Sequence, residues 1–220
     1  MLYTLQLGEL APHWRDFAHG ALFTIALTLT TTVAGVALGV CGASLRAFGP
    51  RWADAIVGAY VEIIRNTPFI VQLFFIFFGL PALGVKLTEA QAAFLAMTIN
   101  LGAYGVEIVR AGLQASPAGQ MEAGLSLGLS RLQILVHILL APALRRVWPA
   151  LSSQIVIVML GSSVVSQISA EDLTYAANLV QSRNFRAFES YLVATLIYLA
   201  LALALRAALR GLGARLFKGA

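Results

Sequence analysis

Residues 116–142 read SPAGQMEAGLSLGLSRLQILVHILLAP and lie between apolar runs, yet they are too mixed in polarity to cross a bilayer. The initial Ser-Pro pair is typical of a helix start, because Ser can cap free N–H groups and Pro suits the first helical position. Gly124 weakens this short helix, and Gly128 is expected to end it in a left-handed turn. Ser130 and Gln133 have the spacing of a capping box. The stretch therefore predicts a helix, a turn and a second helix between membrane segments.

The composition is that of an integral membrane protein. Hydrophobic residues make up 59% of the 220 residues, charged residues make up 11%, and the mean hydropathy is +0.82. A soluble domain has about 45–50% apolar and about 25% charged residues. Because several spans of about 20 residues each leave no room for a large soluble domain, we expect one transmembrane domain over residues 1–220. The single cysteine, Cys41, excludes an internal disulfide and indicates no metal cluster.

The apolar runs predict an all-α, polytopic bundle of about five spans. The amphipathic residues 1–18 are expected to lie at the membrane surface as a retained lead-in. The many Gly and Thr residues of the first run, including Gly35, Gly39 and Gly42, indicate close helix packing. An outer loop at residues 169–190 is expected to be partly helical. The spans are expected at residues 19–45, within residues 54–84, and at residues 90–109, 148–168 and 191–209.

Polar residues surround a predicted break in the second span. Pro68 disfavours a helical conformation at Thr67 and cannot donate to the preceding turn, so a kink or break is expected where the charged residues end. Glu62 and Asn66 lie just before this break. Such polar groups beside a broken helix indicate a functional site, and the alternative is that Glu62 and Arg65 lie at the cytosolic interface.

The third span carries three polar residues on one face. Tyr104 lies four residues after Asn100, and Glu107 lies seven after it, which is about two helical turns. Polar residues at this depth are expected to face the interior of the bundle. For Glu107 the alternative is an interfacial ion pair with Arg110, three residues further on.

The residues Glu122-Ala123-Gly124, followed by Gly128, resemble the E-A-A-x-x-x-G loop of membrane subunits in ATP-binding-cassette (ABC) importers. Here Gly124 replaces Ala, and Pro142 comes one place later than the usual Leu-Pro, which leaves the end of the second helix open. The longer stretches YVEIIRNTPFIVQLFFIFFGLP and GAYGVEIVRAGLQASPAGQMEAGLSLG resemble the polar amino-acid subfamily of these importers, whose substrates include His, Glu, Gln, Arg and opines.

The resemblance implies a permease subunit with the type I ABC importer fold, which forms half of a translocation path in a bacterial cytoplasmic (inner) membrane. It implies two ATP-binding subunits, a second permease subunit that is identical or paralogous, and an extracytoplasmic solute-binding protein. ATP and Mg are expected on the ATPase, because this chain has no G-x-x-x-x-G-K-[ST] loop. The chain is therefore expected not to be an enzyme and to hold no cofactor or metal. Residues 113–146 would form the cytoplasmic coupling loop, with ATPase contacts at Gln120, Glu122, Ala123, Gly124 and Gly128.

The resemblance also implies a translocation path along polar positions. Where the subfamily usually reads Lys-Asp-Thr-Ser-Leu, this chain has Leu160 and Gly161 before two serines, so a carboxylate is missing. Either the substrate charge differs, or a second permease subunit supplies the carboxylate, and the sequence leaves both open. The residues expected along the path are Glu62, Asn66, Thr67, Gln72, Asn100, Tyr104, Glu107, Ser162, Ser163 and Gln167.

The distribution of Lys and Arg predicts the orientation. With the N-terminus outside and the C-terminus in the cytoplasm, 11 of the 15 Lys and Arg residues lie inside. These cations are dispersed among the spans, so the net charge of +5 does not indicate nucleic-acid binding. The alternative class is an autonomous ion-coupled secondary transporter or intramembrane enzyme that uses Glu62, Glu107 and a histidine. The scattered positions of His13, His19 and His137 disfavour it.

Overall fold

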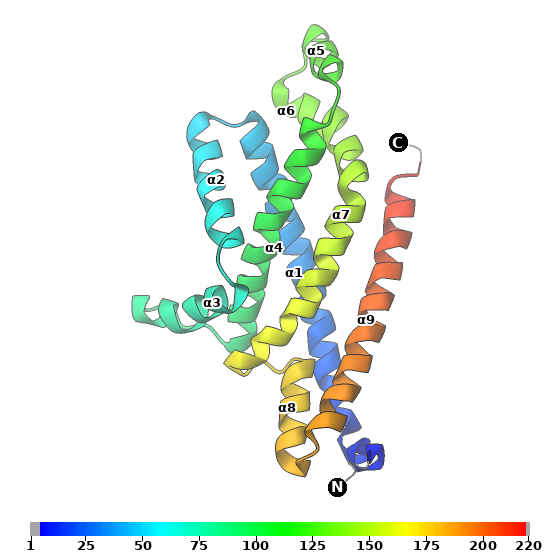
Figure 1. Cartoon of the computed structure of the whole chain (residues 1–220). Coiled ribbons are helices and arrows are strands. Elements are labelled where there is room, and N and C mark those ends of the chain that lie inside the picture. Colours follow the sequence, from blue (N-terminus) through cyan, green and yellow to red (C-terminus); the bar gives the residue numbers. More distant parts are fainter. Residues whose placement is uncertain (1–4, 219–220) are drawn as a thin grey trace. The chain divides into compact units, whose positions relative to one another are not determined.

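The computed structural model describes residues 5–218, and every regular element in that range is helical (Figure 1). The first four residues of the predicted lead-in and the last two residues of the predicted domain lie outside this range. The long helices are α1 (Trp14–Phe48), α4 (Glu89–Gln114), α7 (Leu140–Gly161) and α9 (Ala187–Leu216). The shorter elements are η1 (Leu7–His13), α2 (Arg51–Arg65), α3 (Phe69–Phe74), η2 (Phe75–Gly79), η3 (Leu80–Leu83), α5 (Ala118–Ser126), α6 (Arg131–Ile134), η4 (Leu135–Leu139), η5 (Ser162–Ile168) and α8 (Leu173–Asn184).

Four helical stretches in the described range are long and apolar enough to cross a membrane: Leu7–Phe48, Glu89–Gln114, Arg131–Ile168 and Ala187–Leu216. The count rises to five if Arg51–Arg65 and Phe69–Leu83 together form one broken span. The all-α class is therefore confirmed, and the predicted five spans agree with the larger count. The break falls before Pro68, as predicted, because α2 ends at Arg65 and α3 begins at Phe69.

The helical stretch that contains the predicted fourth span begins earlier than the span itself was predicted to begin. Helical structure continues from Arg131 through Pro142 and Pro149 up to Ile168, instead of beginning near Trp148. The physical reason is the π-helical turn η4, in which the Leu140 N–H donates to the carbonyl of Leu135, five residues back. Such local changes of hydrogen-bond register accommodate the N–H group that a proline lacks.

The chain folds into two compact units, and each long helix contributes to both. The first unit comprises Met1–Thr31, Ile70–Met97 and Val156–Leu205, and the second comprises Thr32–Phe69, Thr98–Ile155 and Arg206–Ala220. In the first unit α8 packs on the start of α1. A Cβ on Gly20 would lie 2.8 Å from the carbonyl oxygen of Asp172, and the Leu173 N–H donates to Thr24 Oγ1 at 3.2 Å. The outer loop is thus partly helical, as predicted.

In the second unit the C-terminal half of α1 packs directly on α4. A Cβ on Gly39 would lie 2.9 Å from the Cα of Gly105, and one on Gly35 would lie 2.8 Å from Leu101 Cγ. Because side chains at these positions would collide, the small residues allow the two backbones to approach closely. This confirms the packing role predicted for the glycines of the first span.

Candidate functional site

Helices α5 and α6 form a hairpin beyond the end of α4 (Figure 1). Gly128 has φ of 74°, its N–H donates to Leu125 O at 2.9 Å, and the Leu129 N–H donates to Gly124 O at 3.1 Å. These two bonds form a Schellman motif, which ends α5 in the left-handed turn predicted at Gly128. We call residues 118–134 the coupling hairpin, after the role that the resemblance predicts for them.

Both halves of the predicted capping box are present at the start of α6. The Ser130 N–H donates to Gln133 Oε1 at 2.8 Å, and the Gln133 N–H donates to Ser130 Oγ at 3.3 Å. The cap predicted at Ser116 was wrong, because Pro117 occupies the N-cap position of α5 and no side chain caps it. The Ser116 hydroxyl instead donates to Gly112 O at 3.5 Å, in the last turn of α4.

The inner face of the coupling hairpin is anchored in an apolar cluster. Met121 and Leu129 pack against buried residues that include Val109, Ile134 and Leu139. Gly124 is buried in the same contact, and a Cβ there would lie 2.7 Å from Ile134 Cγ1. The difference from the family motif at this position therefore has a steric cause, since Ile134 occupies the space that an Ala methyl group would need.

The outer face of the coupling hairpin presents apolar side chains beside one carboxylate. Leu125, Leu127 and Leu132 are 51%, 78% and 68% exposed, and Glu122 and Ala123 are also exposed. Gln120 is half-buried, and within the described residues its Oε1 atom has no hydrogen-bond partner. Gly128 is exposed at the turn. The five predicted ATPase-contact residues thus lie on one hairpin, but Gly124 faces inward and cannot offer a contact surface.

A charged cluster joins α1, α2 and α4 within the second unit. Arg46 donates to Glu107 Oε1 at 2.6 Å, and Arg65 and Arg110 approach the same carboxylate at 3.4 Å and 3.8 Å. Arg46 also donates to Asp54 at 2.9 Å. Three guanidinium groups and two carboxylates leave a net charge of +1. The ion pair of Glu107 with Arg110 exists, but Arg46 and Arg65 lie closer to the carboxylate.

Two of the predicted path residues of the second unit, Tyr104 and Glu107, contact this cluster. The Arg65 guanidinium lies 5.5 Å from the centre of the Tyr104 ring, a cation–π distance, so Tyr104 and Glu107 share one arginine. Asn66 donates to Glu62 Oε2 at 3.0 Å, and both are exposed. Thr67 is exposed at the break and Asn100 is half-buried on α4.

The other predicted path residues belong to the first unit. Gln72 and Ser162 are buried, Ser163 is half-buried, and Gln167 is exposed. Ser163 Oγ donates to Leu160 O at 2.8 Å, within its own helical turn. The translocation path stays a prediction.

Sequence reasoning missed the roles of Arg46 and Asp54, which it used only to mark an aqueous turn. Glu107 lies 61 residues after Arg46, so no local spacing could have paired them. The ion pair of Arg46 with Asp54 could have been suspected from the sequence, because the two opposite charges lie only eight residues apart across a predicted turn. Among residues 5–218, no group of three His, Cys, Asp or Glu side chains could hold a metal ion.

A second polar cluster centres on Asp172, which lies at the start of α8 and outside the membrane-spanning helices, and includes Tyr198 of α9. The fully buried Asp172 caps this helix by accepting from the Tyr175 N–H at 2.8 Å, and it accepts from the Tyr198 hydroxyl at 2.7 Å. Burial raises the pKa of Asp172 to about 6, because a buried carboxylate loses hydration, while these hydrogen bonds offset part of the rise. Because Asp172 binds its proton more tightly in the folded protein, the free energy of unfolding depends on pH.

The fold and the hairpin are those of a multi-pass membrane transport subunit, and comparison with known proteins specifies the family. Residues 33–218 match the family described as binding-protein-dependent transport system inner membrane component. The probable glutamine ABC transporter permease protein GlnM of Bacillus subtilis (strain 168) is 36% identical over 92% of each chain. The glutamine transport system permease protein GlnP of Escherichia coli (strain K12) is 34% identical over 90% of this chain and 91% of its own.

Solved structures agree with these relatives. A chain from the crystal structure of an amino acid ABC transporter with histidines superposes with a TM-score of 0.86 and 31% identity, over 97% of this chain and 100% of the other. A chain of the inward-facing MetNI methionine ABC transporter has a TM-score of 0.80 at 20% identity, which shows the shared fold alone. This chain belongs to the family of inner membrane components of binding-protein-dependent transport systems. The predicted class, the permease subunit of an ABC importer, is confirmed, as is the type I architecture.

Proposed function

We propose that this chain is the transmembrane subunit of an ATP-driven importer of polar amino acids, and that a separate ATPase subunit binds its coupling hairpin. The single observation that carries the coupling role is the two-sided hairpin. One side is anchored by Met121 and Leu129, and the other exposes Leu127, which is 78% accessible. Exposed apolar patches mark contacts with a protein or a membrane, and the carboxylate of Glu122 beside this one favours a protein contact.

The hairpin suits force transmission because one apolar cluster connects it to two long helices. The cluster that holds Met121 also contains Val109 of α4 and Ala143 of α7, so a push on α5 reaches both helices through packed side chains. The Schellman turn and the capping box satisfy the backbone at the hairpin's tip, which makes it a stiff element. ATP hydrolysis would then occur on the partner, and this chain would contribute movement.

The substrate class rests on the relatives, which are named as permeases for glutamine and for L-cystine. Polar amino acids are the class that these names share. Two permease subunits, identical or paralogous, would enclose the path, and an extracytoplasmic solute-binding protein would deliver the substrate. The coupling loop at residues 113–146 and the C-terminus would face the cytoplasm, with the N-terminus outside.

The test of coupling is the charge reversal Glu122→Arg on the exposed face of α5. The variant should insert normally and lose most of the co-purifying ATPase subunit and of the substrate-stimulated ATP hydrolysis. The matched control is Glu89→Arg, since Glu89 is also an exposed carboxylate on a helix and belongs to the other unit. Glu89→Arg should retain the ATPase subunit. Unchanged retention and stimulation in Glu122→Arg would contradict the docking role.

Orientation can be tested separately. A Glu122→Cys substitution in a Cys41→Ala background, which removes the single natural thiol, should react with a membrane-impermeant maleimide only after the cells are permeabilised. Labelling of intact cells would place the hairpin outside, where no cytoplasmic ATPase could reach it.

A further inference from the structure

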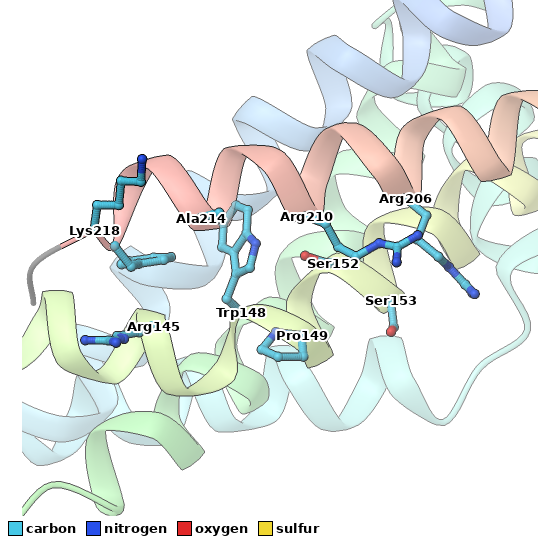
Figure 2. A pocket seen from close by; sticks show the side chains of 11 residues that line it. Arg145, Trp148, Pro149, Ser152, Ser153, Arg206, Arg210, Ala214 and Lys218 are labelled. Carbon is cyan, nitrogen blue, oxygen red and sulfur yellow. The ribbon is translucent and has the colours of Figure 1, made fainter.

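A basic cavity lies between the first half of α7 and the C-terminal end of α9, within the second unit (Figure 2). Its volume is about 860 Å³. The residues that line it are Arg145, Trp148, Pro149, Ser152, Ser153, Arg206, Arg210, Gly213, Ala214, Phe217 and Lys218. They include four cations and no carboxylate.

The four cations of this cavity have no acidic counterpart in the described part of the chain. Within residues 5–218, no carboxylate forms an ion pair with Arg145, Arg206, Arg210 or Lys218. The charged cluster around Glu107 differs, because there each arginine meets a carboxylate. Cations that line one cavity repel one another unless an anion is bound there. The cavity is therefore complementary to an anionic ligand.

The polar wall of the cavity offers hydrogen bonds as well as charge. Ser152 Oγ is buried and has no hydrogen-bond partner within residues 5–218. Figure 2 shows Ser152 of α7 beside the Arg210 side chain of α9. Buried hydroxyl groups normally have a partner, so Ser152 is available to a bound oxygen atom.

The surroundings indicate an amphiphilic anion. The Trp148 indole donates to Leu209 O at 3.0 Å and meets the Phe217 ring edge-on at 5.6 Å, which joins α7 to α9. Trp side chains are enriched at the level of lipid headgroups. On the adjacent stripe of α9, Leu212 and Leu216 are 45% and 60% exposed. Basic groups thus line a cavity beside an apolar helix face, towards the end of a membrane span.

We infer that this cavity binds the phosphate headgroup of an anionic phospholipid whose acyl chains lie along α9. Basic pockets between transmembrane helices are suited to such headgroups, and a single phosphodiester can accept from several guanidinium groups at once. The inference requires only that α9 spans the membrane, and it does not depend on the coupling role of the hairpin.

The experiment uses the full chain, purified in detergent with the subunits that accompany it. Native mass spectrometry would measure the binding of phosphatidylglycerol against phosphatidylcholine with the same acyl chains. The wild-type protein should bind phosphatidylglycerol more tightly, and R206Q/R210Q should lose about fivefold in affinity for each cation removed. The matched control is R215Q, because Arg215 is an exposed arginine on the same helix that does not line the cavity. Its affinity should equal that of the wild type.

The results of these measurements distinguish a phospholipid headgroup from a free anion as the ligand. Equal binding of the two lipids by the wild-type protein, or an equal loss in R215Q, would overturn the inference. Displacement of phosphatidylglycerol by inorganic phosphate at the same phosphate concentration would make this a site for a free anion and would also overturn it. Loss of a second permease copy from R206Q/R210Q, with lipid binding unchanged, would identify a protein interface instead. The wild-type comparison decides the question even if the double variant does not fold.

Discussion

Gly124 of α5 lies so close to Ile134 of α6 that a Cβ added to the glycine would come within 2.7 Å of Ile134 Cγ1 and 2.9 Å of its Cδ1. The two residues close the base of the coupling hairpin, where Ile134 is fully buried. The packing of one helix against the other therefore depends on the absence of a single methyl group. Because the contact is with a side chain and not with backbone, Ile134 has to shift to accommodate an added methyl group.

The first prediction is that Gly124→Ala destabilises the protein by about 1–3 kcal/mol, the usual cost of overpacking a well-packed core. Thermal unfolding of the purified protein in detergent measures the change. Ile134→Ala removes both atoms that the new methyl group would meet, so the double variant should be less destabilised than the sum of the single variants. Gly119→Ala is the matched control, since it lies in the same helix with nothing within 4 Å of its Cβ position. Equal unfolding temperatures for Gly124→Ala and Gly119→Ala would contradict the steric argument.

The second prediction concerns the carboxylate at the centre of the charged cluster. Glu107→Gln leaves three guanidinium groups facing one another, and should lower the free energy of unfolding by about 1–3 kcal/mol. Asp54→Asn should cost only about 0–1 kcal/mol, because that side chain is half exposed and forms an exposed ion pair with Arg46. Chemical or thermal unfolding of the two variants provides the comparison. A loss in Glu107→Gln no greater than in Asp54→Asn would show that the cluster contributes little.

The third prediction is a pH dependence that originates at Asp172. Burial raises the pKa of this carboxyl group to about 6 in the folded protein, above its ordinary value of 3.8. The folded state therefore binds the proton more tightly than the unfolded state. The contribution of Asp172 to stability is fully present below pH 3.8 and is lost as the pH rises through about 6. The loss can reach about 3 kcal/mol.

Asp172→Asn should remove this dependence, because Asn keeps an oxygen that can accept from the Tyr175 N–H at the helix start. The unfolding temperatures of the wild type and the variant should be measured between about pH 4 and pH 7, a window that brackets the shift. The difference between the two proteins isolates Asp172 from other titrating groups. The variant should gain stability relative to the wild type as the pH rises, and parallel curves would refute the assignment.

The amino-acid sequence by itself determined the membrane class, the approximate spans, and the positions at which the first helix of the hairpin ends and the second begins. The left-handed turn at Gly128 and the capping box of Ser130 with Gln133 were predictable because each depends on backbone groups only a few residues away. The break before Pro68 was predictable for the same reason, since proline restricts the residue that precedes it. A short window of sequence is enough to predict hydrogen bonds of this local kind.

Only the tertiary structure decided which helix faces meet. The contact of Arg46 with Glu107, 61 residues apart, depends on how α1 and α4 are rotated about their axes. The burial of Gly124 against Ile134 depends on the angle of the hairpin, and the passage of the helix through Pro142 depends on the π-helical turn before it. In a membrane, lipid is as apolar as the helix surfaces, so hydropathy locates spans without orienting them. Close packing and a few polar contacts set those orientations.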